Sequence, residues 1–161
     1  MILRLPDDAS KQLPTRGQVM VVGTMNNVPF SSPLEPDGKG SHWLHISPST
    51  QNAIRAKVGD TVAVSIEPTT DWIEPTVPAD VTTMLASRPQ AHILWKKITP
   101  LARWEWIRWI RSTNSEATRK RRIEVACSKL ESNERRPCCW NRNLSTEPYV
   151  SKNGVLQAPE S

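Results

Sequence analysis

Arginine and tryptophan side chains are interleaved between residues 103 and 122, and these residue types can bind planar or anionic ligands. An indole face stacks on a cationic or planar group. The guanidinium fork of arginine holds a carboxylate or a phosphate through paired hydrogen bonds. The candidate ligand-binding residues are Arg103, Trp104, Trp109, Arg119 and Arg122. Helical periodicity places them on two consecutive segments, residues 101–112 and 116–132.

Core packing is the competing interpretation of the same side chains. In residues 101–112 the neighbouring Ile107 and Ile110 require burial, so packing is favoured over ligand binding for the indoles. Arg119 shares the apolar face of the next helix, where a guanidinium needs an acceptor. We expect that acceptor to be a structural partner, such as Glu105 or a helix-end carbonyl, with an anionic ligand as the less favoured alternative.

Lys120 and Arg121 point away from that apolar face and are candidate nucleic-acid contacts. Charge is divided unevenly along the chain, with 6 basic and 9 acidic residues through Asp80 and 15 basic and 7 acidic residues from Val81 onward. A basic half beside a mildly acidic one favours binding to nucleic acid or to anionic surfaces, although many basic domains bind neither. Nucleic-acid binding through the basic C-terminal half is therefore an alternative function.

Other spacings argue against most enzyme classes. The glycines around Lys39 sit in a turn without the flanks of a phosphate-binding loop, and no helix is expected after Ser41. His42 and His45 are three residues apart on an expected strand, so they point to opposite faces and cannot act together. No nucleophile elbow, metalloprotease helix or dinucleotide-binding glycine pattern occurs. We therefore expect no catalytic residue and favour a non-enzymatic protein.

The cysteines and the hydropathy pattern indicate where the protein works. Cys127, Cys138 and Cys139 are an odd set without metal-ligand spacing, which favours free thiols over a zinc site or any other metal site. Neither a secretory signal nor an apolar run long enough to span a membrane is present. The sequence thus predicts a soluble protein of the reducing cytoplasm, without a cofactor.

Short strands and turns fill the first half of the chain. Strands are expected at residues 18–25, 28–34, 42–46 and 61–67, and a helix at residues 49–56. The turn signal at residues 36–40 should join the second and third strands into a hairpin. Such a set of short strands predicts a small β-barrel, because closing the sheet removes its exposed edges.

A proline-rich junction at residues 68–78 leads into helices at 80–86, 90–97, 101–112 and 116–132. Thr99 and Pro100 should begin the third of these helices, while Thr113 and Glu116 have the spacing of a capping box for the fourth. The fold class is therefore α+β, with a small β-barrel at residues 1–74 followed by a helical domain with an irregular tail at residues 75–161.

Two stretches carry a family resemblance. Residues 16–68, with LEPDGKGSHWLHI and KVGDTVAVSIEP, resemble the small-barrel domain of unknown function found upstream of YdeI/OmpD-associated domains. ITPLARWEWIRWI and EATRKRRIEVACSKL resemble the YdeI/OmpD-associated, or bacteriocin-protection, domain. The residues that match this second motif are Thr99, Pro100, Arg103, Thr118, Arg119, Arg121, Arg122 and Ile123. The resemblance implies a bacterial role in stress or bacteriocin tolerance and brings no catalytic residue with it.

The sequence therefore predicts a non-enzymatic bacterial protein that acts by binding an unidentified protein or small ligand. Nucleic-acid binding is the second hypothesis, and an enzyme with a pocket between the two domains is the third. The sequence leaves the oligomeric state and the role of Cys138 and Cys139 open.

Overall fold

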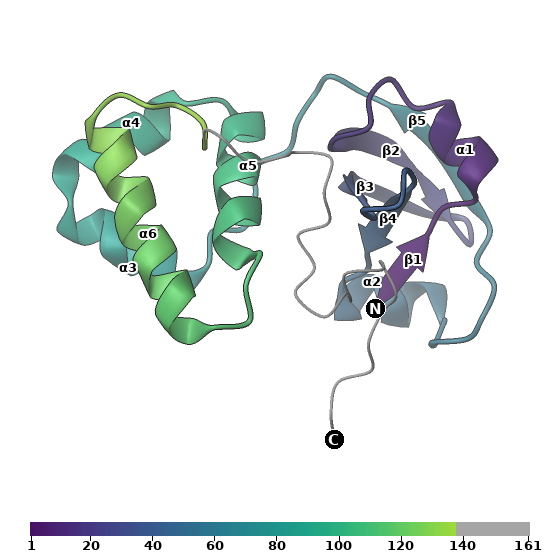
Figure 1. Ribbon diagram of the computed structural model, residues 1–161. Coiled ribbons are helices and arrows are strands. Elements are labelled where there is room, and N and C mark those ends of the chain that lie inside the picture. The colour runs from purple at the N-terminus through teal and green to yellow at the C-terminus, as the bar shows by residue number, and fades with distance from the viewer. Residues whose placement is uncertain (138–161) are drawn as a thin grey trace. The chain divides into compact units, whose positions relative to one another are not determined.

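The computed structural model describes residues 1–137, so Cys138 and Cys139 lie outside the described residues. The described chain forms two compact units, residues 1–73 and residues 74–137 (Figure 1). We call them the N-terminal domain and the helical domain. No helix among residues 1–137 is long and apolar enough to cross a membrane.

A five-stranded antiparallel sheet and two short helices build the N-terminal domain. The elements are β1 (Ile2–Arg4), α1 (Asp7–Lys11), β2 (Val19–Met25), β3 (Val28–Pro36), β4 (His42–His45), α2 (Pro48–Ile54) and β5 (Val64–Pro68). Glu35 of β3 lies opposite Trp43 of β4, which confirms the expected hairpin. Asn26 and Asn27 turn the chain between β2 and β3 with φ angles of 47° and 66°, a conformation that asparagine tolerates.

The sheet is open, whereas we expected a closed barrel. Its strand order is β1-β4-β3-β2-β5, so β1 and β5 are the edges, and no pairing joins them within residues 1–137. All neighbouring strands are antiparallel. The two edges consequently run in the same direction, and direct closure would require a parallel pair in an otherwise antiparallel sheet.

One face of the sheet forms the core of this domain. Alternate residues of every strand point to that face, where they pack with α2 and its flanks. The buried apolar members are Leu5, Val19, Val21, Met25, Leu34, Leu44, Ile46, Ile54 and Ala56. Ser47 caps the N-terminus of α2 by accepting a hydrogen bond from the Thr50 N–H at 3.1 Å, and Pro48 follows it at the first helical position.

Four helices make up the helical domain: α3 (Ala79–Ser87), α4 (Pro89–Lys97), α5 (Pro100–Arg111) and α6 (Glu116–Glu131). The side chain of Thr99 accepts from the Ala102 N–H at 3.2 Å, which confirms the predicted start of α5. Helix α6 begins at Glu116 as predicted, but its cap differs from the prediction, because Ser115 and not Thr113 accepts the capping hydrogen bond, from the Thr118 N–H at 3.3 Å. The Thr113 hydroxyl instead accepts from the Ser115 N–H at 3.1 Å.

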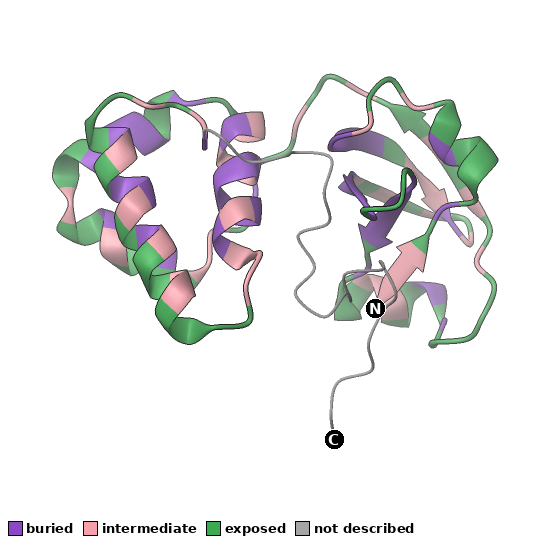
Figure 2. Cartoon of the chain, viewed as in Figure 1, coloured by how far each residue is buried: buried purple, intermediate pink, exposed green. Residues whose placement is uncertain are grey.

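Helix α6 packs against each of the other three helices, and α5 is covered along its whole length. None of its residues is exposed, and Figure 2 shows it in the colours of buried and intermediate residues along its length. The polar side of α5 is covered as well, since Glu105 and Arg108 are buried. Residues 132–137, which follow α6, lie over this side of α5. There the Trp106 indole N–H donates to the Arg135 carbonyl at 3.0 Å, and Arg136 pairs with Glu105 at 3.2 Å.

Candidate functional site

Arg103 joins α5 to the end of α4. Its Nε donates to the Trp95 carbonyl and its Nη2 to the Lys96 carbonyl, both at 2.9 Å. The remaining Nη1 holds the two carboxylate oxygens of Glu74 at 2.5 and 2.6 Å. Carbonyls at a helix C-terminus lack intrahelical donors and carry partial negative charge. Arg103 therefore caps α4, and its described contacts are structural.

Arg122 caps the C-terminus of α5 in a similar way. Its Nη1 donates to the Trp109 carbonyl at 2.9 Å and to the Ser112 hydroxyl at 2.6 Å, at the C-terminus of α5. The guanidinium also lies 5.6 Å from the centroid of the Trp109 ring, within cation–π range. Burial lowers the pKa of Arg122, an effect that leaves so strong a base protonated. This residue fixes the corner between α5 and α6.

Arg119 pairs with a carboxylate of another helix. Its Nε and Nη2 donate to the two carboxylate oxygens of Asp80, in the first turn of α3, at 2.6 and 2.9 Å. The hydrogen bonds raise the pKa of Arg119 and lower that of Asp80. The Arg119 side chain is 28% exposed, so it is half-buried and not on the fully buried face of α6. The acceptor is thus a carboxylate, as expected, but the residue is Asp80 and not Glu105.

Lys120 and Arg121 are exposed, in agreement with their expected positions on α6. Arg119 and Lys120 also line a cleft of about 600 Å³ between α3 and α6. We call it the α3–α6 cleft. The other residues that line it are Asp80, Thr83, Met84, Ser87, Glu116 and Ile123. Of the residues singled out in the sequence, the cleft thus brings together one ligand-binding candidate and one nucleic-acid candidate.

The α3–α6 cleft has an apolar floor and balanced charges. Ile123 is buried, and Met84 packs against the core of the domain. Two cations, Arg119 and Lys120, and two carboxylates line the cleft. The guanidinium of Arg119 is already paired with one of these carboxylates, that of Asp80. Thr83 and Ser87 use their hydroxyl protons on the Ala79 and Met84 carbonyls at 2.8 and 2.7 Å, which leaves their oxygens able to accept. Such a site suits a mainly apolar ligand with few polar groups.

The tryptophans of α5 do not line this cleft. Trp104 and Trp109 are half-buried, and the ring of Trp109 meets that of Trp106 edge to face at a centroid distance of 5.9 Å. Asp80 and Met84, which line the cleft, were not predicted from the sequence. The available signal was their spacing, because residues 80, 83, 84 and 87 recur at helical intervals and share one face of α3.

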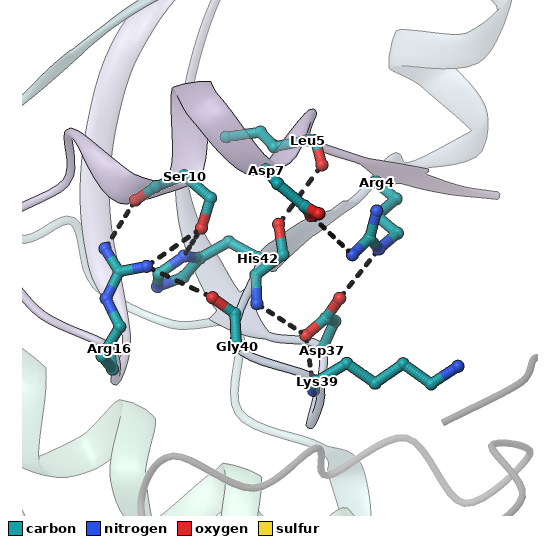
Figure 3. Close-up of polar contacts among 10 residues, drawn as sticks. Arg4, Leu5, Asp7, Ser10, Arg16, Asp37, Lys39, Gly40 and His42 are labelled. Atoms are coloured by element: carbon teal, nitrogen blue, oxygen red, sulfur yellow. Dashed lines mark hydrogen bonds and ion pairs between the residues drawn. The ribbon is translucent and has the colours of Figure 1, made fainter. Parts of the chain in front are cut away.

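A buried polar network occupies the N-terminal domain (Figure 3). His42 lies with Nδ1 2.7 Å from the Ser10 hydroxyl and Nε2 2.8 Å from the Gly17 carbonyl. A carbonyl only accepts, so Nε2 carries the proton and Nδ1 accepts from Ser10. Arg16 donates to the same hydroxyl at 3.2 Å and to the Ser10 carbonyl at 2.5 Å. Both Ser10 and His42 are fully buried, which makes this serine–histidine pair structural.

Asp37 organises the turn between β3 and β4. One carboxylate oxygen accepts from the Lys39 and Ser41 N–H groups at 2.7 and 3.0 Å, and the other accepts from Arg4 Nε at 2.8 Å (Figure 3). Burial by itself raises the pKa of Asp37. The hydrogen bonds from Lys39, Arg4 and Ser41 outweigh it, so the pKa lies below its ordinary value.

The remaining candidates for chemistry are separated from one another. His45 lies 3.5 Å from Glu35 and is exposed, whereas His42 is buried. Cys127 is a buried free thiol whose pKa is raised by burial. Within residues 1–137 no group of three or more histidine, cysteine, aspartate or glutamate residues could hold a metal ion.

The fold and the helix-joining arginines define a two-domain α+β protein, with a small antiparallel sheet followed by a four-helix unit. Residues 1–66 match the model of a domain of unknown function, DUF1905. Residues 74–133 match the model OmdA, described as bacteriocin-protection, YdeI or OmpD-associated. The chain thus carries a DUF1905 domain at residues 1–66, followed by an OmdA (YdeI/OmpD-associated) domain at residues 74–133. No curated protein and no solved structure matches it.

Proposed function

We propose that the protein contributes to bacteriocin protection or stress tolerance by binding, without a covalent step, and that the α3–α6 cleft is its ligand site. The observation that carries this proposal is a cleft of about 600 Å³ with the apolar side chains of Met84 and Ile123 beside exposed Lys120. Pockets of this size and lining are typical of small-molecule sites.

The lining favours one ligand chemistry. Arg119 is held by Asp80, so the bidentate fork that would select a phosphate or carboxylate is already occupied. Lys120 offers one charged donor, and Thr83 and Ser87 offer acceptor oxygens. The ligand is therefore a compact, mainly apolar molecule with one or two polar groups, and not a polyanion.

Methionine signals give a direct test in the full chain. Met84 is the only methionine after Met25, so ¹³C-methyl labelling of methionine places one reporter in the cleft and the others in the N-terminal domain. A library of small neutral and zwitterionic fragments should contain members that shift the Met84 methyl signal alone. If no fragment shifts the Met84 signal, the proposal is wrong.

Neighbouring threonines provide a matched pair of variants. Thr83 and Thr82 are both exposed on α3, but only Thr83 lines the cleft. Thr83→Trp should fill the cleft and abolish fragment binding, whereas Thr82→Trp should leave it intact. In bacteria challenged with a bacteriocin, survival conferred by the protein should be lost with Thr83→Trp and kept with Thr82→Trp. Equal survival with both variants would show that protection does not depend on the α3–α6 cleft.

Nucleic-acid binding is the second candidate function, supported by the exposure of Lys120 and Arg121 on one turn of α6. If it occurs, affinity for duplex DNA should fall with salt with a log–log slope of about −0.9 for each phosphate neutralised. Lys120→Ala and Arg121→Ala should each reduce that slope. Folded protein that does not bind DNA at low salt would eliminate this candidate.

A further inference from the structure

The two edges of the N-terminal sheet border a single cavity. It has a volume of about 520 Å³ and lies between β1 and β5. Its apolar lining includes Ile2, Leu3 and Leu5 on the β1 side and Val62, Val64 and Ile66 on the β5 side. The segment 57–61 completes the rim, where Val58 is 85% exposed.

Both edges present unused backbone groups toward the outside of the sheet. Leu5 donates to the His42 carbonyl and Met1 accepts from the Ile46 N–H, so the odd residues of β1 pair with β4. The N–H and C=O groups of Ile2 and Arg4 therefore point to the free edge.

The same reasoning applies to β5. The Ala63 carbonyl accepts from the Asn26 N–H, and the Thr69 N–H donates to the Met20 carbonyl. In the β2–β5 register these two contacts show that every second residue of β5, counted from Ala63, forms hydrogen bonds with β2. The backbone groups of Val64 and Ile66 consequently point away from β2, to the second free edge.

Strand direction limits what can fill the space between the edges. Because β1 and β5 run in the same direction, they cannot pair with each other in the antiparallel manner of the rest of the sheet. One additional strand that is antiparallel to both would complete a six-stranded, fully antiparallel barrel. The number and direction of the strands thus favour one inserted strand.

We propose that the β1–β5 cavity binds an extended peptide segment of a partner protein, which adds to the sheet as its sixth strand. Apolar residues at every second position of the segment face the lining of the cavity, and the backbone pairs with Ile2, Arg4, Val64 and Ile66. Lys57 on the rim is exposed, and no described residue pairs with its ammonium group, so an acidic residue of the segment lies at that end.

This occupant fits better than two others. A strand inside the sheet of a second, folded copy has at most one free edge, whereas the inserted strand must pair on both of its edges. A small molecule does not carry donors and acceptors at the repeat of a β-ladder. This proposal concerns the N-terminal domain and does not depend on the α3–α6 cleft.

A displayed library of random octapeptides, selected on the full-length protein, tests the proposal. Selected peptides should alternate apolar and polar residues and carry an acidic residue. In hydrogen exchange followed by NMR, a selected peptide should protect the Ile2, Arg4, Val64 and Ile66 amides. The Leu3 and Ser65 amides, which already pair within the sheet, serve as internal controls and should not change.

Two backbone changes separate strand pairing from apolar contact. A selected peptide that is N-methylated at alternate amides keeps its side chains but should bind at least about 10-fold more weakly, because the ladder donors along one of its two edges are lost. Ile66→Pro removes an outward N–H of β5 and should reduce affinity far more than Ile66→Ala, which keeps it. The hydrogen-exchange experiment uses the wild-type chain, so it tests the proposal even if Ile66→Pro fails to fold.

Four results would overturn the proposal. They are a selection that enriches no alternating sequence, equal binding of the N-methylated peptide, amide protection confined to the helical domain, and a concentration-dependent dimer that protects the four edge amides without peptide.

Discussion

Arg119 of α6 and Asp80 of α3 meet through two parallel hydrogen bonds of 2.6 and 2.9 Å, so the start of one helix is fixed to the first turn of the other. This pair forms one wall of the α3–α6 cleft. It also sets Arg119 apart from Lys120 and Arg121, which carry the same charge but are exposed.

Arg119→Ala should destabilise the helical domain more than Arg121→Ala does. Arg119 is half-buried and Asp80 is exposed, so we expect a loss of about 1 kcal/mol, well below the value of about 3 to 5 kcal/mol that is typical of fully buried pairs. Urea unfolding followed by circular dichroism measures the difference. Identical midpoints for the two variants would show that the Asp80 pair contributes nothing to stability.

Acid should weaken the same contact. The hydrogen bond from Arg119 holds the pKa of Asp80 below its ordinary value in the folded chain, so the unfolded chain binds this proton more readily. The contribution of the pair is complete above about pH 4 and is lost as the pH falls through the folded-state pKa. The stability difference between the wild type and Asp80→Asn should therefore shrink on acidification. Glu124→Gln, at an exposed position of α6, is the control.

Ser10→Ala should destabilise the N-terminal domain. The change removes the donor to His42 Nδ1 and one acceptor of Arg16, all within a buried network. A buried polar group left without its partner costs about 1 to 3 kcal/mol. Ser31→Ala, at an exposed position of β3, should leave the thermal midpoint of this domain unchanged. Equal midpoints for the two variants would contradict the assigned network.

Gly23→Ala should disrupt the pairing of β2 with β5. A Cβ atom at Gly23 would lie 1.9 Å from the Ser65 carbonyl oxygen and 2.9 Å from the Ile66 Cα, and both are backbone atoms with little freedom to move. We expect a loss at or above the upper end of the range of about 1 to 3 kcal/mol for overpacking. Thr24→Ser, at the next position, should be tolerated. Thermal unfolding of both variants measures this contrast.

Local sequence signals located most of the elements. The alternation of Val62, Val64 and Ile66 indicated β5, and Thr99 before Pro100 indicated the start of α5, because each signal acts within a few residues. β1 and α1 were missed. They contain 3 and 5 residues, too few for a periodic pattern, and α1 has no side-chain cap.

Long-range relationships were harder to obtain from the sequence. The periodicity of α6 separated Arg119 from Lys120 and Arg121, but it could not name Asp80, which lies 39 residues away. Barrel closure was wrong for a related reason. The number of strands could be estimated from turns, whereas their order and the direction of both edges depend on pairings between distant segments.

Cys127 should react with an alkylating reagent only after the helical domain unfolds. Its side chain is buried and burial raises its pKa, so both access and the thiolate fraction are low in the native state. Peptide mapping by mass spectrometry after brief iodoacetamide treatment distinguishes Cys127 from Cys138 and Cys139. Rapid native alkylation at Cys127 would contradict the packing of α6.

The segment that covers α5 has a consequence for where the helical domain can be shortened. The family match ends at residue 133, but the carbonyl that accepts from Trp106 belongs to Arg135, and the partner of Glu105 is Arg136. Pro137 is buried as well. A chain trimmed at the end of the family match would leave a buried indole N–H without its acceptor. The smallest stable helical unit therefore extends at least to residue 137.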